Sequence, residues 1–189
     1  MSSFVHPTLQ RQRFHHPSDA PAQAAHARNV LRLLLAQDGS TTRLCEAIAG
    51  GPVSLQVLEQ RVVHAVPAEV RTALPGSSFI ERITCIAAHG QVMMDNLSYI
   101  ALKGLPPDLR RDLEGGLIPI GHLLARLWVR RAFLEAAPML IERLWGVVGL
   151  PDPDASRAYC IATPEGPRML IAETYRRGML MGRDGPANA

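Results

Sequence analysis

Residues 169–177 read MLIAETYRR, and this stretch decides how the C-terminal part of the chain is interpreted. Strand side chains point alternately to the two faces of a sheet. The side chains that share one face of such a strand are Met169, Ile171, Glu173 and Tyr175. Three of the four are apolar or aromatic, whereas ionised carboxylates avoid apolar faces unless a partner compensates them. The pattern predicts a strand in which Glu173 needs an explanation.

Strand patterns also occur upstream of this stretch. Residues 52–66 are rich in β-branched side chains that alternate with polar ones, which predicts a strand. Residues 79–102 are typical of two strands joined as a hairpin at His89-Gly90. Residues 157–180 predict a second pair of strands around the turn at 164–167.

Helix patterns fill most of the remaining chain. A first helix is expected after Ser18 or Asp19 as N-cap, and Asp38-Gly39 ends it. Ser40 then caps a short helix that stops at Gly50-Gly51. Further helices are expected within 105–116 and from 138 to Gly149, while 67–78 form a connection with about one helical turn.

Residues 117–137 are ambiguous. We divide them into a helical turn after Pro119 and a strand around Leu127 to Leu134, but a single long helix fits the same letters. With the elements above, the division predicts an α+β fold, with a mainly antiparallel sheet flanked by helices.

The composition of the chain is that of one globular domain. The chain has 189 residues, of which 47% are hydrophobic and 20% charged, enough to support a core. We expect a poorly ordered arm over residues 1–18, a single domain over 19–180 and a flexible tail over 181–189.

Several functional classes are not favoured by the sequence. The net charge of +3 is spread along the chain without interleaved aromatic residues, so nucleic-acid binding is not expected. Three widely spaced cysteines and seven histidines without a ligand spacing predict no metal site, and no nucleotide-binding loop is present. No run of about 18 apolar residues and no signal-peptide pattern occurs, which predicts a cytoplasmic protein without a membrane span.

Two charges inside apolar runs are candidates for a site. In FIERITCI, residues 79–86, Arg82 shares one face with isoleucine and threonine while Glu81 lies on the other. Alternation alone leaves open which of the two points inward. Arg82 and Glu173 fit either solvated or ion-paired structural charges, or an anion site in which the guanidinium binds a carboxylate. The Pro119-Ile120-Gly121 turn can present backbone N–H groups to an anion, although most turns of Gly and Pro serve only to reverse the chain.

Four segments taken together resemble a known family. They are residues 38–60 (DGSTTRLCEAIAGGPVSLQVLEQ), 80–124 (beginning IERITCI and ending PIGHLL), 129–135 (VRRAFLE) and 157–175 (RAYCIATPEGPRMLIAETY). This order resembles the chorismate pyruvate-lyases, the 4-hydroxybenzoate synthases, over roughly residues 30 to 179. The resemblance implies an antiparallel sheet with a ligand buried beneath helical flaps and a reaction that needs no cofactor.

The resemblance also implies roles for individual residues. Arg82 matches the arginine that holds the ring carboxylate, and Glu173 the glutamate at the hydroxyl end. Ile120, with Gly121 beside it, matches a backbone contact to the carboxylate, and Thr41 falls near another. For the second carboxylate of chorismate the candidate cations are Arg130, Arg131 and Arg157.

Departures from the family pattern concern the ligand. Asn96 stands where a small residue is common, beside Asp95, and Tyr175-Arg176 replace an aromatic residue followed by proline. The leading hypothesis is a chorismate lyase whose ligand is an anionic aromatic or pre-aromatic acid. The alternatives are a homologue that isomerises or cyclises another such acid, and a binder without catalysis. The family fold is also similar to effector-binding domains of bacterial transcription regulators, but no helix-turn-helix pattern precedes this one. The oligomeric state does not follow from the sequence.

Overall fold

The chain forms an antiparallel sheet covered on both faces. The computed structural model describes residues 9–115, 118–125, 128–134 and 137–181. Within these residues the strands lie side by side in the order β1-β2-β3-β6-β5-β4. Their bounds are β1 Ser54–Val63, β2 Phe79–Ala88, β3 Gln91–Ala101, β4 Arg130–Phe133, β5 Ser156–Thr163 and β6 Gly166–Tyr175. The α+β class expected from the sequence is confirmed.

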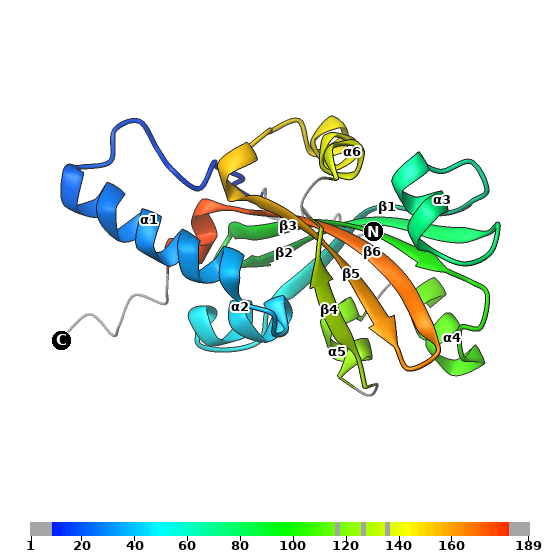
Figure 1. Cartoon of the computed structure of the whole chain (residues 1–189). Helices are drawn as coiled ribbons and strands as arrows, with labels where there is room; N and C mark the ends of the chain where they lie inside the picture. Colours follow the sequence, from blue (N-terminus) through cyan, green and yellow to red (C-terminus); the bar gives the residue numbers. More distant parts are fainter. Residues whose placement is uncertain (1–8, 116–117, 126–127, 135–136, 182–189) are drawn as a thin grey trace, which may run out of the picture.

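Helices form a layer on each face of this sheet. Their bounds are α1 Pro21–Ala36, α2 Thr41–Ala49, α3 Ala68–Ala73, α4 Pro107–Gly115, α5 Ile120–Leu124 and α6 Pro138–Val148, with 3-10 turns at Pro153–Ala155 and Arg177–Leu180. In Figure 1, α3 and α6 lie above the sheet, whereas α2, α4 and α5 lie below it. Apolar clusters fill both interfaces, one beneath α3 and α6 and one beneath α4 and α5.

The ambiguous segment 117–137 contains a short helix and a strand, as in the division made above. Pro119 is the N-cap of α5, and β4 pairs with β5 from Arg130 to Phe133. Leu127, where the strand was expected to begin, lies outside the described residues. A single long helix across this region was therefore the weaker reading.

The first helix begins later than the sequence predicted. Its N-cap is Ala20, followed by Pro21, whose fixed φ suits the first helical position. Asp19 does not cap the helix because its carboxylate accepts hydrogen bonds from Arg177 at 2.6 and 3.0 Å. The Ala20 N–H instead donates to the side-chain oxygen of Gln23, 3.2 Å away.

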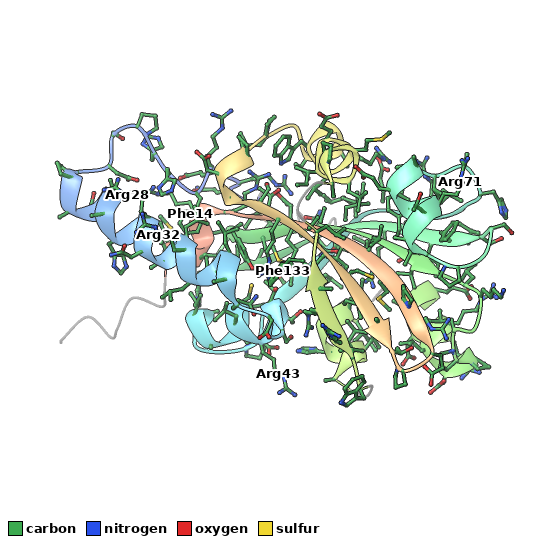
Figure 2. The ribbon with its side chains drawn as sticks, in the orientation of Figure 1. Phe14, Arg28, Arg32, Arg43, Arg71 and Phe133 are labelled. Atoms are coloured by element: carbon green, nitrogen blue, oxygen red, sulfur yellow. The ribbon has the colours of Figure 1, made fainter. Side chains whose placement is uncertain are left out.

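Residues 9–18 belong to the folded unit, which corrects the poorly ordered arm expected over 1–18. Phe14 is fully buried, and its N–H donates to Oδ2 of Asp152 at 2.8 Å. Gln10 exchanges backbone hydrogen bonds with Gly90 and Val92 at the end of the β2–β3 hairpin. Figure 2 shows Phe14 inside the molecule near α1. Residues 1–8 and 182–189 lie outside the described residues, so those parts of the arm and tail stay predictions.

The strand register assigns Arg82 and Glu81 to opposite faces. Arg82 pairs with Ser98, and two positions along β3 Asn96 pairs with Glu173. Because side chains alternate, Arg82 and Glu173 lie on the same face, which α2, α4 and α5 cover. Glu81 lies on the face covered by α3 and α6.

Glu81 anchors α6 to the sheet. Its Oε1 accepts hydrogen bonds from Arg61 at 2.7 Å and from Arg143 of α6 at 2.9 Å, and Tyr99 donates to its Oε2. Burial by itself would raise the pKa of Glu81, but the hydrogen bonds from Arg143, Tyr99 and Arg61 outweigh it, and the pKa lies below its ordinary value of 4.5.

The lowered pKa predicts how stability depends on pH. The stabilisation from a carboxylate with a depressed folded pKa is present above the unfolded value, and it is lost as pH falls through 4.5 to the folded value. We expect Glu81→Gln to lower the free energy of unfolding by roughly 1–3 kcal/mol at pH 7, and by progressively less below pH 4.5. Urea titrations of both proteins from pH 7 to 3 measure this. A difference that does not shrink with acid would contradict it.

Candidate functional site

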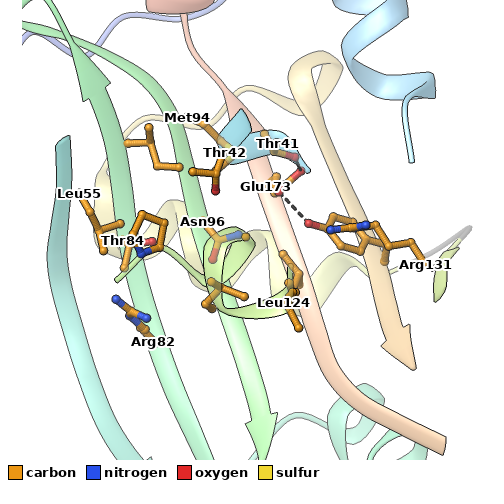
Figure 3. Close-up of a pocket in the computed structure, with 16 residues that line it drawn as sticks. Thr41, Thr42, Leu55, Arg82, Thr84, Met94, Asn96, Leu124, Arg131 and Glu173 are labelled. Atoms are coloured by element: carbon orange, nitrogen blue, oxygen red, sulfur yellow. Dashed lines mark hydrogen bonds between the residues drawn. The ribbon is translucent and has the colours of Figure 1, made fainter. Parts of the chain in front are cut away.

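A cavity lies between the sheet and the helices α2 and α5. Its floor comes from β2, β3 and β6, and residues of α2 and α5 cover it on the side away from the sheet (Figure 3). Its volume is about 30 Å³. The cavity brings together all five residues that the sequence singled out: Thr41, Arg82, Ile120, Gly121 and Glu173. The structure places these five residues at one cavity, and their binding roles stay predictions.

Glu173 is enclosed by hydrogen-bond donors. It is 2% exposed, and its Oε1 accepts from the hydroxyl of Tyr159 at 2.8 Å. Oε2 accepts from Nε of Arg157 at 3.0 Å and from Thr41 at 3.2 Å. A polar cluster thus compensates the carboxylate that seemed out of place in the sequence. Its ion pair is with Arg157 and not with Arg82, which differs from the structural pair left open above, and its place at the cavity leaves the functional reading open.

Arg157 holds this cluster to the end of α1. One of its terminal nitrogens, Nη1, donates to the carbonyl oxygens of Leu34, Leu35 and Gln37, at 2.6 to 3.2 Å. The guanidinium also lies over three aromatic rings, 5.3 to 5.4 Å from their centroids. Burial acts to lower the pKa of Arg157, but the charge of Glu173, the hydroxyls of Tyr175 and Tyr159 and the hydrogen bond to Glu173 together outweigh it, and the pKa is raised. This side chain is committed to Glu173.

Tyr159 is a site residue that the sequence did not reveal. Burial and the neighbouring Glu173 charge raise its pKa well above the ordinary value, so its hydroxyl stays protonated and donates to Glu173. Burial and the same charge also raise the pKa of Tyr175, whose hydroxyl donates to the Leu34 carbonyl at 3.0 Å. The signal available in the sequence was the two-residue spacing from Arg157 to Tyr159, which puts both on one face of a strand.

Arg82 lies at the other end of the cavity floor. It is fully buried, and Nη1 and Nη2 donate to the carbonyl oxygen of Ile118, at 3.3 and 3.2 Å. Burial lowers the pKa of Arg82. A charge that burial disfavours gains from an anion placed beside it, and the guanidinium fork matches a carboxylate.

The covering helices meet at Gly121. A Cβ added there would lie 2.5 Å from Oγ1 of Thr42 and 2.8 Å from Oγ of Ser40, so α5 approaches α2 too closely for any side chain. Ser40 is the N-cap of α2, as expected, and accepts from the N–H of Arg43 at 3.4 Å. Small-molecule pockets usually measure about 300–1,000 Å³, so the cavity of about 30 Å³ is smaller than a ring-sized ligand requires.

The three candidate arginines for a second carboxylate have different positions. Arg157 is engaged by Glu173, and Arg130 is exposed on β4. Arg131 lines the cavity, and among the described residues its buried Nε has no hydrogen-bond partner. Its Nη1 donates to the carbonyl oxygen of Asp38, 3.1 Å away. Of the three, Arg131 is the cation at the cavity wall.

Asp95 and Asn96, which are neighbours in the sequence, point to opposite faces of the sheet, and only Asn96 lines the cavity. Asp95 is fully buried away from the cavity, between Arg176 at 2.6 Å and Arg11 at 3.1 Å. Arg176, which follows Tyr175 in the sequence, therefore forms a buried ion pair with Asp95. Asn96 lies in the cavity floor, between Thr84 and Glu173 (Figure 3).

The described residues provide neither a metal-binding cluster nor a helix that could cross a membrane. They contain no group of three or more His, Cys, Asp or Glu side chains arranged to hold a metal ion. No helix among them has the length and apolar character that crossing a bilayer requires.

Known proteins resemble this chain only in structure. No protein-family model and no curated protein sequence matches it. The ligand-binding domain of a candidate GntR-family transcriptional regulator from Bordetella bronchiseptica is 17% identical, with a TM-score of 0.41 over 66% of this chain and 83% of that one. The C-terminal domain of the histidine utilization repressor from Pseudomonas syringae pv. tomato is 8% identical, with a TM-score of 0.42 over 72% and 99%.

A third solved structure is a candidate transcriptional regulator from Streptomyces coelicolor. It is 20% identical, with a TM-score of 0.44 over 68% of this chain and 89% of that one. With TM-scores below 0.5, these likenesses carry no inference about the ligand or reaction of this chain. Its function has to be argued from its own residues.

Proposed function

We propose that this chain converts chorismate to 4-hydroxybenzoate and pyruvate. The observation that carries the proposal is the placement of Arg82 and Glu173 at one cavity, with Arg131 in its wall. Chorismate has two carboxylates and a ring hydroxyl. Two guanidinium groups suit the two carboxylates, and Glu173 suits the hydroxyl-bearing end. Apolar side chains from Leu55, Ile86 and Ile171 supply surface for the ring.

The proposed reaction is a single elimination. The ether C–O bond breaks and its electron pair leaves with the enolpyruvyl oxygen, while the adjacent hydroxyl-bearing carbon loses its proton. The ring becomes aromatic, and the leaving enolate takes up a proton on its methylene carbon to give pyruvate. Aromatisation drives the reaction, so the protein mainly has to orient the ring and exclude water. Arg82 holds the ring carboxylate and Glu173 is placed to receive the proton.

Pyruvate release tests the proposal directly. Purified protein is incubated with chorismate, and pyruvate is followed by NADH consumption with lactate dehydrogenase. The expected result is pyruvate formation proportional to protein concentration, accompanied by 4-hydroxybenzoate in equal amount. A rate equal to that of chorismate alone would refute catalysis.

Arg131 provides a more specific prediction. Because only chorismate has a second carboxylate, Arg131→Ala should raise the Kd or KM for chorismate roughly tenfold and leave the Kd for 4-hydroxybenzoate unchanged. Arg130→Ala, the neighbouring exposed position, is the matched control. Equal losses for both ligands, or an equal effect of the control, would place the second carboxylate elsewhere.

Binding without turnover is the second candidate function. It is favoured by the state of Glu173, whose two oxygens already accept hydrogen bonds from Tyr159, Arg157 and Thr41. On this reading the cluster fixes the hydroxyl end of a bound aromatic acid. A single-turnover experiment, with protein in excess over chorismate, separates the two candidates because an enzyme with slow product release still forms one equivalent of pyruvate.

A further inference from the structure

Polar side chains cross the floor of the cavity in one row. Thr84 of β2 pairs with Asn96 of β3, and Asn96 pairs with Glu173 of β6. Directly opposed residues have their Cβ atoms about 4.5–5.5 Å apart. Arg82 lies two positions from Thr84 on the same face, so Asn96 is the immediate neighbour of Glu173 and Arg82 is one row farther away.

Asn96 and Thr84 are largely buried residues whose polar side chains line the cavity. Asn96 is 8% exposed and Thr84 is 5% exposed, and both line the cavity. In the part of the chain that the structure describes, neither side chain has a hydrogen-bond partner. Buried polar groups normally have such partners, and an amide offers two donor hydrogens and an acceptor oxygen. Packing alone would be served by apolar side chains here, so these groups are available to a ligand.

We propose that Asn96, with Thr84, binds a third polar group on the ligand ring, and so selects ring acids substituted next to the hydroxyl-bearing carbon. This inference rests on the proposed function, because Arg82 and Glu173 define the two ends of the ring. The neighbour position of Asn96 beside Glu173 places the third group at ring carbon 3, counted from the carboxylate. The ligand class is a 4-hydroxy ring acid with an oxygen or amino substituent at that carbon. Chorismate belongs to it, through its ether oxygen.

The selectivity can be measured with four probes that differ only at carbon 3. They are 4-hydroxybenzoate and its 3-hydroxy, 3-amino and 3-methyl derivatives, and their Kd values are compared by calorimetry. The wild-type protein should bind the 3-hydroxy and 3-amino acids about tenfold more tightly than the 3-methyl acid, which has similar size but cannot form the hydrogen bond.

Substitution of Asn96 tests whether this residue causes the preference for the 3-hydroxy and 3-amino acids. In Asn96→Ala and Asn96→Leu the preference over the 3-methyl acid should fall to about twofold or less. The comparison is made within each variant, so a change in cavity size cancels. Asn29→Ala, at an exposed position of α1, is the control and should keep the wild-type preference. Melting curves verify that each variant is folded.

The outcomes separate this inference from the proposed function. If 4-hydroxybenzoate binds but the wild-type protein shows no preference, or if Asn96→Ala and Asn96→Leu retain it, the role of Asn96 is refuted while the acid site stands. If none of the four acids binds to wild-type protein, the assignment of the cavity as an acid site fails, and the role of Asn96 fails with it.

Discussion

Arg82→Ala should weaken the binding of 4-hydroxybenzoate by about two to four decades in Kd. Removing one partner of a buried charge pair costs roughly 3–5 kcal/mol, because the other charge is left uncompensated, and about 1.4 kcal/mol corresponds to one decade. Arg82 is fully buried at the cavity, so the carboxylate of a bound acid would be left in a site with little water. Calorimetric titration of both proteins measures the change.

Two further variants make this prediction specific. Arg71→Ala removes an exposed arginine from α3, on the other side of the sheet (Figure 2), and should bind like the wild-type protein. Arg82→Lys keeps a positive charge but loses the planar fork, so its affinity should lie between those of the wild type and Arg82→Ala. Wild-type affinity in a folded Arg82→Ala protein would remove Arg82 from the site.

Glu173→Gln should lower the free energy of unfolding by roughly 3–5 kcal/mol, because it leaves the buried Arg157 without its counter-charge. The two side chains are 2% and 6% exposed, and their closest atoms are 3.0 Å apart. The carbonyl oxygens of Leu34 and Gln37 also accept hydrogen bonds from Arg157, and these bonds reduce the loss of stability. Urea denaturation followed by circular dichroism gives the value.

A double variant shows whether the loss comes from the pair. Glu173→Gln combined with Arg157→Met removes both charges, and it should be clearly more stable than either single variant, since buried pairs can be replaced by apolar groups at little cost. Additive losses in the double variant would show that the two side chains stabilise the fold independently. Rates measured on Glu173→Gln have to be corrected for the fraction of protein that is folded.

The sequence alone determined the local elements of this protein. Alternation at residues 169–175 predicted the strand that carries Glu173, and Ser40 with Gly50 marked the ends of a short helix. Pro119 favoured a division into a helical turn and a strand, which the structure shows as α5 and β4, although the letters alone left a single long helix open. These signals act within a few residues of their cause, through φ restriction, capping and side-chain alternation.

Local signals failed where a distant partner intervened. Ser18 or Asp19 was expected to cap α1, but the N-cap is Ala20, and Arg177 binds the carboxylate of Asp19. The segment around Phe14 contains no periodic pattern, and it is held by Asp152 and by the β2–β3 hairpin. Such contacts join residues more than 70 positions apart, and no single-sequence pattern encodes them.

Only the tertiary structure decided the site. Every residue of β2 except the last is buried, because helices cover both faces of the sheet, so alternation could not say whether Arg82 or Glu81 faces the cavity. The register of β2 against β3 and of β3 against β6 settled this and placed Asn96 beside Glu173. Likewise, Glu173 forms its ion pair with Arg157 because the pairing of β5 with β6 places these two residues opposite each other. The sequence thus determined which unusual side chains exist, and strand pairing determined which of them meet, because a one-residue shift in register exchanges the two faces of a strand.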